Sequence, residues 1–546
     1  MKPDLCCRQL VRIAVTSRRI SRRFRKAPLF PFSLEMKDYY NSGARPSPNS
    51  WGGTMSSKDI SSSQRIIQPL TEKQLLAPQR AGYYETVWPS EHTDLWRSHA
   101  VSNVGLPADF DPEKLAVTTA NLNLPVWGYT RTKTEVFAIG GSPFMLNIFT
   151  QMIKDGGTGD TAESSRSAAL TETSIRAAAA DRKNSVPYLA KINPLTMQVT
   201  QFEMTEGSTI NYTGGLLMHE NGFVYAVSRS FLYKVDPETM RAVASAPLPL
   251  VGESDEQNYW TTYNGLQVVA SGELVIKGFS FLDSASIEGW LLLVDPDSLK
   301  IDVQQSEMLS SARLTIQQAP DGSATLYQVN ATQSLRFKIT DAGFVLDDAW
   351  TRTYRTEDDG TTQASSPLLF GKVGQVVFAD NTAPGATTPI NLYDQPVDVN
   401  DLPASLEGIN AFDSSAAGFN FFMVAGDPFE RQTLVYYDPI NNLLGAHTVL
   451  ADGTLERLWE RNGSYKVSAS PAIVPDRDLL YIDDYQNGTD SLVVLRLSTG
   501  EKLAAVPLAA NLPTIGTIFL GMNEDVYILS SEAGGNNGLI SRIFVR

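Results

Sequence analysis

The chain has 546 residues and 42% hydrophobic content, enough to bury a large core, and its formal net charge is −15 at pH 7. The acidic balance argues against nucleic acid as a partner, because phosphate binding requires a basic patch. Both cysteines, Cys6 and Cys7, lie at the start, so the remaining chain has no thiol nucleophile or thiolate metal site. No apolar run reaches the roughly 20 residues of a transmembrane helix.

The first part of the chain differs from the rest in charge. Residues 1–35 hold nine Lys or Arg against two acids, a balance of +7, which leaves −22 for the remaining chain. We expect residues 1–35 to be a basic leader or a non-native extension, and Met36 and Met55 are alternative starts. The stretch after the arginines, residues 27–34, contains two prolines and is too short for the apolar core of a signal peptide.

Residues 36–112 are polar and carry Ser, Pro and Gly, so we expect a linker or lead-in that lies partly on the folded domain. Within it, residues 88–99 combine aromatic, acidic and basic side chains with His92 and His99. Two interpretations stay open for this stretch: a cap across one face of the domain, or plain packing of the lead-in.

A short strand-and-turn phrase recurs in the next part of the chain. Its clearest copies are residues 191–197, 234–240, 293–299 and 436–442, in which a strand runs into Asp-Pro or Asn-Pro. This pair is typical of a tight turn between antiparallel strands, because Asp or Asn bonds the backbone beyond it and Pro has its φ preset. Weaker copies end near Ile339, Asp394, Leu497 and Ile543.

The step between copies is roughly 43 to 60 residues, the size of a four-stranded propeller blade. We therefore predict an all-β chain in which residues 113–546 form a β-propeller of eight blades, with seven as the alternative. The last repeat stops at its third strand, residues 539–545, so the fourth strand of that blade is expected from residues 114–119. Pairing of the two ends would close the ring and leave no open sheet edge.

Residues 142–186 interrupt the first blade. Their first half has apolar residues at helical spacing, and residues 170–182 are rich in Ala. We expect an insertion that either packs on the ring or acts as a lid or docking element.

Two later blades resemble a known family. Residues 365–378 and 468–481 each place Ser-Pro before an apolar strand, a turn and a second apolar strand, and the latter continues to a Thr499-Gly500 turn. These segments resemble the repeat of quinoprotein-like (PQQ-like) β-propellers, and the blade pattern, which is also WD40/YVTN-like, extends over roughly residues 121–546. The family's dehydrogenases usually carry a Trp after the Thr-Gly turn, whereas this chain has Leu503 to Pro507 without one.

A loop in the seventh blade offers oxygen ligands. Asp483, Asp484, Asn487 and Asp490 are a weak candidate Ca²⁺ site, although the spacing is not that of an EF-hand. An Asn-Gly hairpin turn is the preferred interpretation of this loop.

The innermost strands of a propeller line its axis, so residues at the start of each first strand are candidates for a ligand-binding funnel. The candidates are Trp127, Tyr212, Trp260, Tyr263, Asn264, Gln317, Ser366 and Ser470. They are polar and aromatic with few charges, which favours a neutral polar ligand; the alternative is that they only satisfy backbone groups around the axis.

The sequence carries no catalytic signature: a Gly-x-Ser-x-Gly elbow, a phosphate-binding loop and a His-Glu-x-x-His motif are all missing. The preferred hypothesis is a non-catalytic binding or scaffold protein, periplasmic or secreted, that presents loops and an axial funnel to a protein or a neutral polar ligand. The alternative that the resemblance implies is a PQQ- and Ca²⁺-dependent oxidoreductase of alcohols or sugars, with Trp127 or Trp260 as the floor of the quinone site.

Overall fold

The computed structural model describes residues 78–122, 126–141, 186–210, 212–252, 254–280, 287–309, 311–356, 364–381, 388–419, 424–532 and 537–546. The expected leader, residues 1–35, the first part of the lead-in and most of the expected insertion lie outside these described residues. In the described part of the chain, no helix is both long and apolar enough to span a bilayer.

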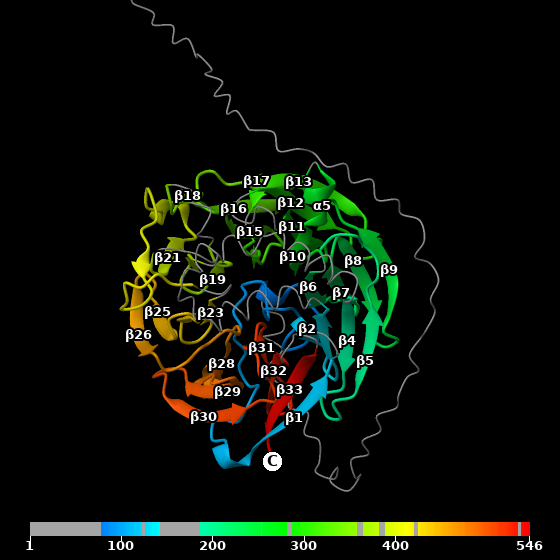
Figure 1. The fold of residues 1–546 in the computed structure, drawn as a ribbon. Coiled ribbons are helices and arrows are strands. Elements are labelled where there is room, and N and C mark those ends of the chain that lie inside the picture. The colour runs from blue at the N-terminus through cyan, green and yellow to red at the C-terminus, as the bar shows by residue number, and fades with distance from the viewer. Residues whose placement is uncertain are drawn as a thin grey trace, which may run out of the picture. The chain divides into compact units, whose positions relative to one another are not determined.

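Eight antiparallel sheets, counted over the described residues, stand in a ring (Figure 1). The eight-blade prediction is confirmed, and the seven-blade alternative is wrong. Blades 1 to 4 comprise β2 (Val126–Arg131), β3 (Val136–Gly140), β4 (Tyr188–Ile192) and β5 (Val199–Glu203); β6 (Thr213–Met218), β7 (Val224–Ser228), β8 (Phe231–Asp236) and β9 (Arg241–Pro247); β10 (Thr261–Val268), β11 (Leu274–Ser280), β12 (Ile287–Val294) and β13 (Ile301–Leu309); and β14 (Thr315–Gln318), β15 (Ala324–Val329), β16 (Gln333–Thr340) and β17 (Gly343–Leu346) with β18 (Arg352–Thr353).

Blades 5 to 8 follow in the same order. They comprise β19 (Leu368–Phe370), β20 (Gln375–Ala379), β21 (Asn391–Pro396) and β22 (Ile409–Asn410); β23 (Ala425–Asp427), β24 (Thr433–Asp438), β25 (Leu443–Val449) and β26 (Leu455–Asn462); β27 (Ala472–Val474), β28 (Leu479–Gln486), β29 (Thr489–Arg496) and β30 (Lys502–Pro507); and β31 (Ile518–Leu520), β32 (Asp525–Ser531), β33 (Gly538–Val545) and β1 (Leu115–Asn121). Short helical turns are η1 (Pro78–Arg80), η2 (Pro112–Lys114), α5 (Asp255–Tyr259), η4 (Val399–Asp401) and η5 (Pro475–Arg477).

The ring closes as the sequence predicts. β1 pairs with β33 in antiparallel register from Leu115↔Val545 to Asn121↔Leu539, so the blade that ends the chain takes its outer strand from the N-terminal side. Figure 1 shows β1 beside the red C-terminal strand β33. This pairing removes the open edge that each end would otherwise present.

The recurring turn has the same local structure in several blades. In the copy after β8, the Asp236 carboxylate accepts the amide of Glu238 at 2.8 Å, and the Met240 N–H donates to the Asp236 carbonyl at 2.9 Å. Met240 has φ +53°, and the equivalent residues Met197, Leu299 and Asn442 are also left-handed. The turn is therefore one residue longer than the predicted type I turn, because the bond closes from the fifth residue to the first.

Burial explains the apolar second strands. β3, β7 and β20 are buried along their whole length, since each blade packs both faces against its neighbours. The outer strand β9 instead alternates between exposed and half-buried residues. The core consequently lies between blades, and each blade depends on the next.

Candidate functional site

The centre of the ring is occupied by the chain itself. Residues 78–106, which we call the axial segment, run through the middle of the ring in Figure 1 (blue). The segment contacts all eight blades. It accepts backbone amides from blades 1, 2, 4, 5, 6 and 7, in that order: Arg131 N–H donates to Trp88 O (3.1 Å), Met218 N–H to Pro89 O (2.6 Å), Ile316 N–H to Leu95 O (2.9 Å), Leu369 N–H to Trp96 O (3.3 Å), Gly426 N–H to Ser98 O (2.9 Å) and Ile473 N–H to His99 O (2.9 Å). It donates to blade 3 from the Tyr83 hydroxyl to the Gln267 side chain, and to blade 8 from Gly105 N–H to Gly521 O (3.3 Å).

The bonds to blades 5, 6 and 7 repeat one geometry. Leu369, Gly426 and Ile473 are each the middle residue of a three-residue first strand, and each donates its amide to a carbonyl of the axial segment. These amides face the axis, where an open channel would offer them to water or to a ligand. The axial segment therefore takes up backbone donors of the channel wall.

An unusual backbone lets the axial segment turn around the axis. Thr93, Arg97, His99 and Asn103 all have φ between +58° and +69°, a region that non-glycine residues rarely adopt. The buried carboxylate of Asp94 holds the turn by accepting the Trp96 amide at 3.0 Å and the Ser98 hydroxyl at 2.7 Å. Such strain persists only where surrounding bonds determine the conformation, as they do here.

A bidentate ion pair joins the axial segment to blade 4. Arg313 donates from Nε to Glu91 Oε2 at 3.0 Å and from Nη2 to Glu91 Oε1 at 2.7 Å. The two side chains are 10% and 13% exposed. Burial alone would lower the pKa of Arg313, but the Glu91 charge raises it above its usual value.

Two further cations lie near this pair. Burial, and then the charge of Arg313, lower the pKa of Arg97 to about 9, while the Glu91 charge opposes the shift. Burial also lowers the pKa of Lys277 well below its usual value, with Arg313 and Arg97 adding to the effect. Lys277 donates to the carbonyl of Ala312, next to Arg313. Three basic side chains, Arg97, Lys277 and Arg313, therefore lie close together, and Glu91 is the acid that pairs with Arg313.

His92 and His99 form a pair within the axial segment. Nδ1 of His92 and Nε2 of His99 are 2.6 Å apart, and both side chains are buried. Burial and the nearby Arg97 charge lower the pKa of both rings well below 6.5. The pair is accordingly neutral at pH 7, with one ring donating to the other. Of the two earlier interpretations of residues 88–99, the buried contacts favour packing at the axis.

Some of the predicted funnel residues do meet at one place. The Ser366 hydroxyl accepts the Arg313 amide at 2.7 Å, and Asn264 Nδ2 donates to the Ser311 carbonyl at 2.6 Å. The Tyr212 hydroxyl lies against the Arg313 side chain, and burial raises the pKa of Tyr212. These three residues surround residues 311–313, the entry into β14.

The other predicted residues make different contacts. Trp260 is buried in an apolar cluster with Tyr212 and Phe419. The Tyr263 hydroxyl donates to the Pro249 carbonyl at 2.5 Å, and Gln317 accepts the Tyr327 hydroxyl at 2.7 Å. The remaining two are Ser470, whose amide donates to Gly516 O at 2.8 Å, and Trp127, which is in β2 but whose side chain is outside the described residues.

The candidate calcium loop is a hairpin turn. Asn487 and Gly488, with φ +52° and +81°, connect β28 to β29, as the preferred interpretation predicts. Asp483 accepts the Ser468 and Ala469 amides, and Asp490 accepts the Thr514 amide, so both carboxylates hold neighbouring loops. Asp484 accepts the Lys466 amide at 2.9 Å. Burial raises the pKa of Asp483 to about 6. Burial, and then the Asp483 charge, also raise the pKa of Asp490 well above its usual value.

The residues at the axis do not fit a Ca²⁺–quinone site. Within the described ranges, no three His, Cys, Asp or Glu side chains are grouped so that they can hold a metal ion. Trp260, proposed as an aromatic floor, has its ring buried against Tyr259 at 5.4 Å between centroids. Of the two carboxylates in residues 91–94, Glu91 is already paired with Arg313, and Asp94 accepts the Trp96 amide and the Ser98 hydroxyl.

Sequence reasoning missed the charged residues of the axis. Glu91 and Arg97 belong to the residues 88–99 stretch, whose mixture of charges and aromatics was a usable signal. Lys277 lies in β11 and Arg313 just before β14, and neither carried a signal, because only the ring brings them to one place.

No family model and no curated protein sequence matches this chain. Among solved structures, it is similar to the quinohemoprotein alcohol dehydrogenase ADHIIG from Pseudomonas putida HK5, with a TM-score of 0.56 and 10% identity, over 88% of this chain and 83% of that one. It is also similar to the WD40 domain of SCAP from fission yeast, with a TM-score of 0.42 and 8% identity, over 79% and 98% of the two chains. A third similar structure is the Dos1 propeller, with a TM-score of 0.43 and 12% identity, over 65% and 86%. At such identity the first likeness concerns the fold alone, an eight-bladed β-propeller.

Proposed function

We propose that the chain is a non-catalytic β-propeller that binds a protein partner through its face loops and its rim. The observation that carries this proposal is the axial segment, whose carbonyls accept amides from the first strands of successive blades. A propeller axis is where a cofactor or small substrate would enter between the first strands. Here the axial segment occupies that space and accepts the amides of the first strands. A partner would therefore bind at the loops and the rim.

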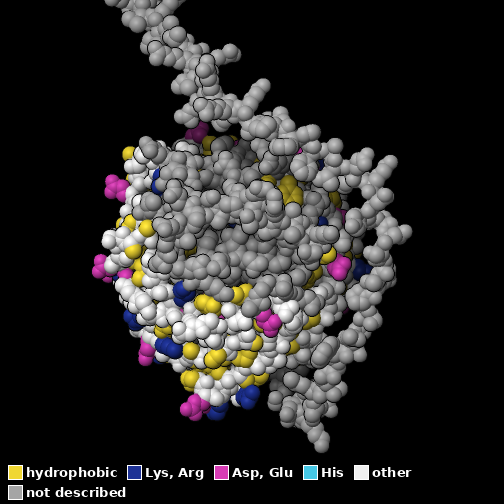
Figure 2. Space-filling view, in the orientation of Figure 1, with side chains coloured by type: hydrophobic (Ala, Val, Ile, Leu, Met, Phe, Trp, Pro, Cys, Tyr) yellow, Lys and Arg dark blue, Asp and Glu magenta, His cyan; other side chains and the backbone are white. Residues whose placement is uncertain are grey.

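The charge of the chain indicates the chemistry of the partner. The chain without its first 35 residues carries −22, and on the face shown in Figure 2 Asp and Glu side chains stand around the edge of the described surface, interspersed with Lys and Arg. A positively charged protein surface would be attracted to such a rim, and the attraction would weaken as salt rises. A neutral polar ligand at the axis has less support, because Asn264 and Ser366 already bond the backbone around Arg313.

Two measurements test the proposal. Carbodiimide cross-linking in a native extract joins carboxylates directly to lysines of a partner, and mass spectrometry then locates the joined residues. We expect cross-links at exposed acids of the loops and rim, and we expect the purified partner to bind with an affinity that falls as salt rises. A partner whose binding is unaffected by salt would contradict the charge argument.

The second measurement addresses the oxidoreductase alternative. The purified chain is mixed with PQQ and Ca²⁺ and assayed for dye-linked oxidation of alcohols and sugars. We expect no turnover above that of PQQ and Ca²⁺ without protein. Turnover that requires the folded chain would overturn the non-catalytic proposal.

A further inference from the structure

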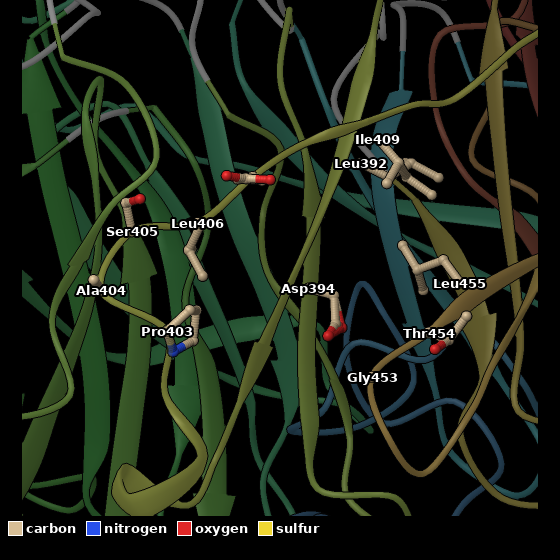
Figure 3. A pocket seen from close by; sticks show the side chains of 11 residues that line it. Leu392, Asp394, Pro403, Ala404, Ser405, Leu406, Ile409, Gly453, Thr454 and Leu455 are labelled. Carbon is tan, nitrogen blue, oxygen red and sulfur yellow. The ribbon is translucent and has the colours of Figure 1, made fainter.

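A cavity of about 540 Å³ opens between blades 5 and 6, and none of its lining residues belongs to the axial segment. Figure 3 shows Asp394 between one wall of residues 403–406 and another of Thr454 and Leu455. The lining residues are Leu392, Asp394, Pro403, Ala404, Ser405, Leu406, Glu407, Ile409, Gly453, Thr454 and Leu455. This volume lies within the range of pockets that bind small ligands.

The cavity exists because blade 5 has a short outer strand. β22 has two residues, Ile409 and Asn410, and pairs with Asn391 and Leu392 only. The chain before β22 bonds to blade 4 instead, since Leu406 N–H donates to Thr353 O at 3.2 Å. The rest of β21, including Asp394, therefore has no paired outer strand. In blade 6, by contrast, the outer strand β26 pairs with β25 along its whole length. The gap between these elements is the cavity.

Asp394 is the ionisable group at the bottom of this gap. Its Oδ1 is buried without a hydrogen-bond partner, while its Oδ2 accepts a bond at 3.3 Å once the side-chain amide of Gln375 is turned so that its nitrogen faces the carboxylate. Gly453, with φ +82°, permits the close approach, because a Cβ there would lie 2.5 Å from Asp394 Oδ2. The lining set contains a second carboxylate, Glu407, and no Lys or Arg.

We propose that this cavity binds a cationic group carried on an apolar stem, either an amine or a guanidinium. The Asp394 carboxylate, which lines the cavity, would accept a charge-assisted hydrogen bond from the cation. Leu392, Leu406 and Leu455 would cover the stem, and Glu407 adds negative charge at the wall. The ligand is a free amine or the basic side chain of a partner protein, and the test below separates these sources.

The pH dependence of binding supports the assignment. Burial, and then the charge of Asp452, raise the pKa of Asp394 to about 7. The groups that face Asp394 are the Gln375 amide from β20, Glu407, and Asp452 in the turn between β25 and β26. A bound cation stabilises the ionised carboxylate, so binding releases a proton below pH 7. The affinity should therefore rise with pH up to about 7 and level off above it.

The test is calorimetric titration of the purified full chain with defined probes. The probes are Nα-acetyl-lysine methylamide, its arginine counterpart and cadaverine, with Nα-acetyl-norleucine methylamide as the uncharged match for lysine. We expect the cations to bind and norleucine to bind at least about tenfold more weakly. Binding of cadaverine but not of the capped amino acids indicates that the ligand is a free amine. Binding of the capped amino acids but not of cadaverine indicates the side chain of a partner protein. Equal binding of the lysine and norleucine probes would overturn the proposal.

Two variants complete the test. Asp394→Asn should lose about tenfold or more in affinity for the cations and should lose the pH dependence. Asp452→Asn removes the same charge from an exposed neighbour and should change the affinity by less than about threefold. If Asp394→Asn does not fold, the carboxyl carbon of Asp394 can be followed by NMR in the unmodified chain, where a cation should lower its pKa. An unchanged pKa at saturating probe, or unchanged binding in Asp394→Asn, would refute the assignment.

Discussion

Replacing Glu91 by glutamine removes the carboxylate that pairs with Arg313 at the centre of the ring. The pair is bidentate, with bonds of 2.7 and 3.0 Å, and both side chains are almost fully buried. The Glu91→Gln variant leaves Arg313 uncompensated beside Arg97, whose pKa already reflects the Arg313 charge. Breaking a buried pair on one side costs about 3–5 kcal/mol, so the free energy of unfolding should fall by about that amount.

Urea unfolding followed by tryptophan fluorescence measures the loss. In the double variant Glu91→Gln/Arg313→Met the unpaired charge is gone, and most of the stability should return. The control is Asp302→Asn, which breaks the exposed Lys300–Asp302 pair at 2.7 Å and should cost less than about 1 kcal/mol. A Glu91→Gln cost as small as that control, or a double variant as unstable as the sum of its parts, would refute the idea that the axial pair is a buried, coupled contact.

Three further predictions concern the ring. Deleting residues 114–123 removes β1 from its pairing with β33 and should lower the melting temperature of the whole ring; an unchanged melt would argue against closure. Gly214→Ala places a Cβ 1.2 Å from the Tyr263 carbonyl oxygen and should cost more than about 2 kcal/mol, whereas Gly222→Ala, with open space but φ +86°, should cost about 1 kcal/mol. The carboxyls of Asp394 and Asp483, with pKa raised to about 7 and about 6, favour the folded state when protonated, so their contribution is complete below pH 3.8 and is lost as pH rises through 6 and 7. The urea midpoint of Asp394→Asn should accordingly fall less between pH 5 and pH 8 than that of the unmodified chain, and equal slopes would contradict the shift.

The ring could be predicted from the sequence because its determinants are local. Each Asp-Pro or Asn-Pro turn fixes one corner through bonds within five residues, as Asp236 and Met240 illustrate. The Asn487-Gly488 turn is equally local. Repetition of such corners sets the number of blades, and an incomplete last repeat indicates which strand closes the ring.

The site was harder to predict because it depends on where side chains point. Tyr212, Asn264 and Ser366 converge on residues 311–313, as their positions at strand entries suggest. Tyr263 does not join them, because neighbouring residues of a strand point to opposite faces and the Tyr263 hydroxyl donates to the Pro249 carbonyl instead. The axial segment has no periodic pattern at all, since left-handed residues such as Thr93 and His99 set its path.

Hydrogen–deuterium exchange of the axial segment tests most directly whether the chain fills its own axis. Amides of Tyr84, Val101 and Gly105 donate to carbonyls of the ring, and peptides from residues 79–106 should therefore exchange as slowly as those from β28 and β32. Exchange of these peptides at the rate of an unfolded chain, with β28 and β32 still protected, would show an open axis and contradict the proposed binding mode.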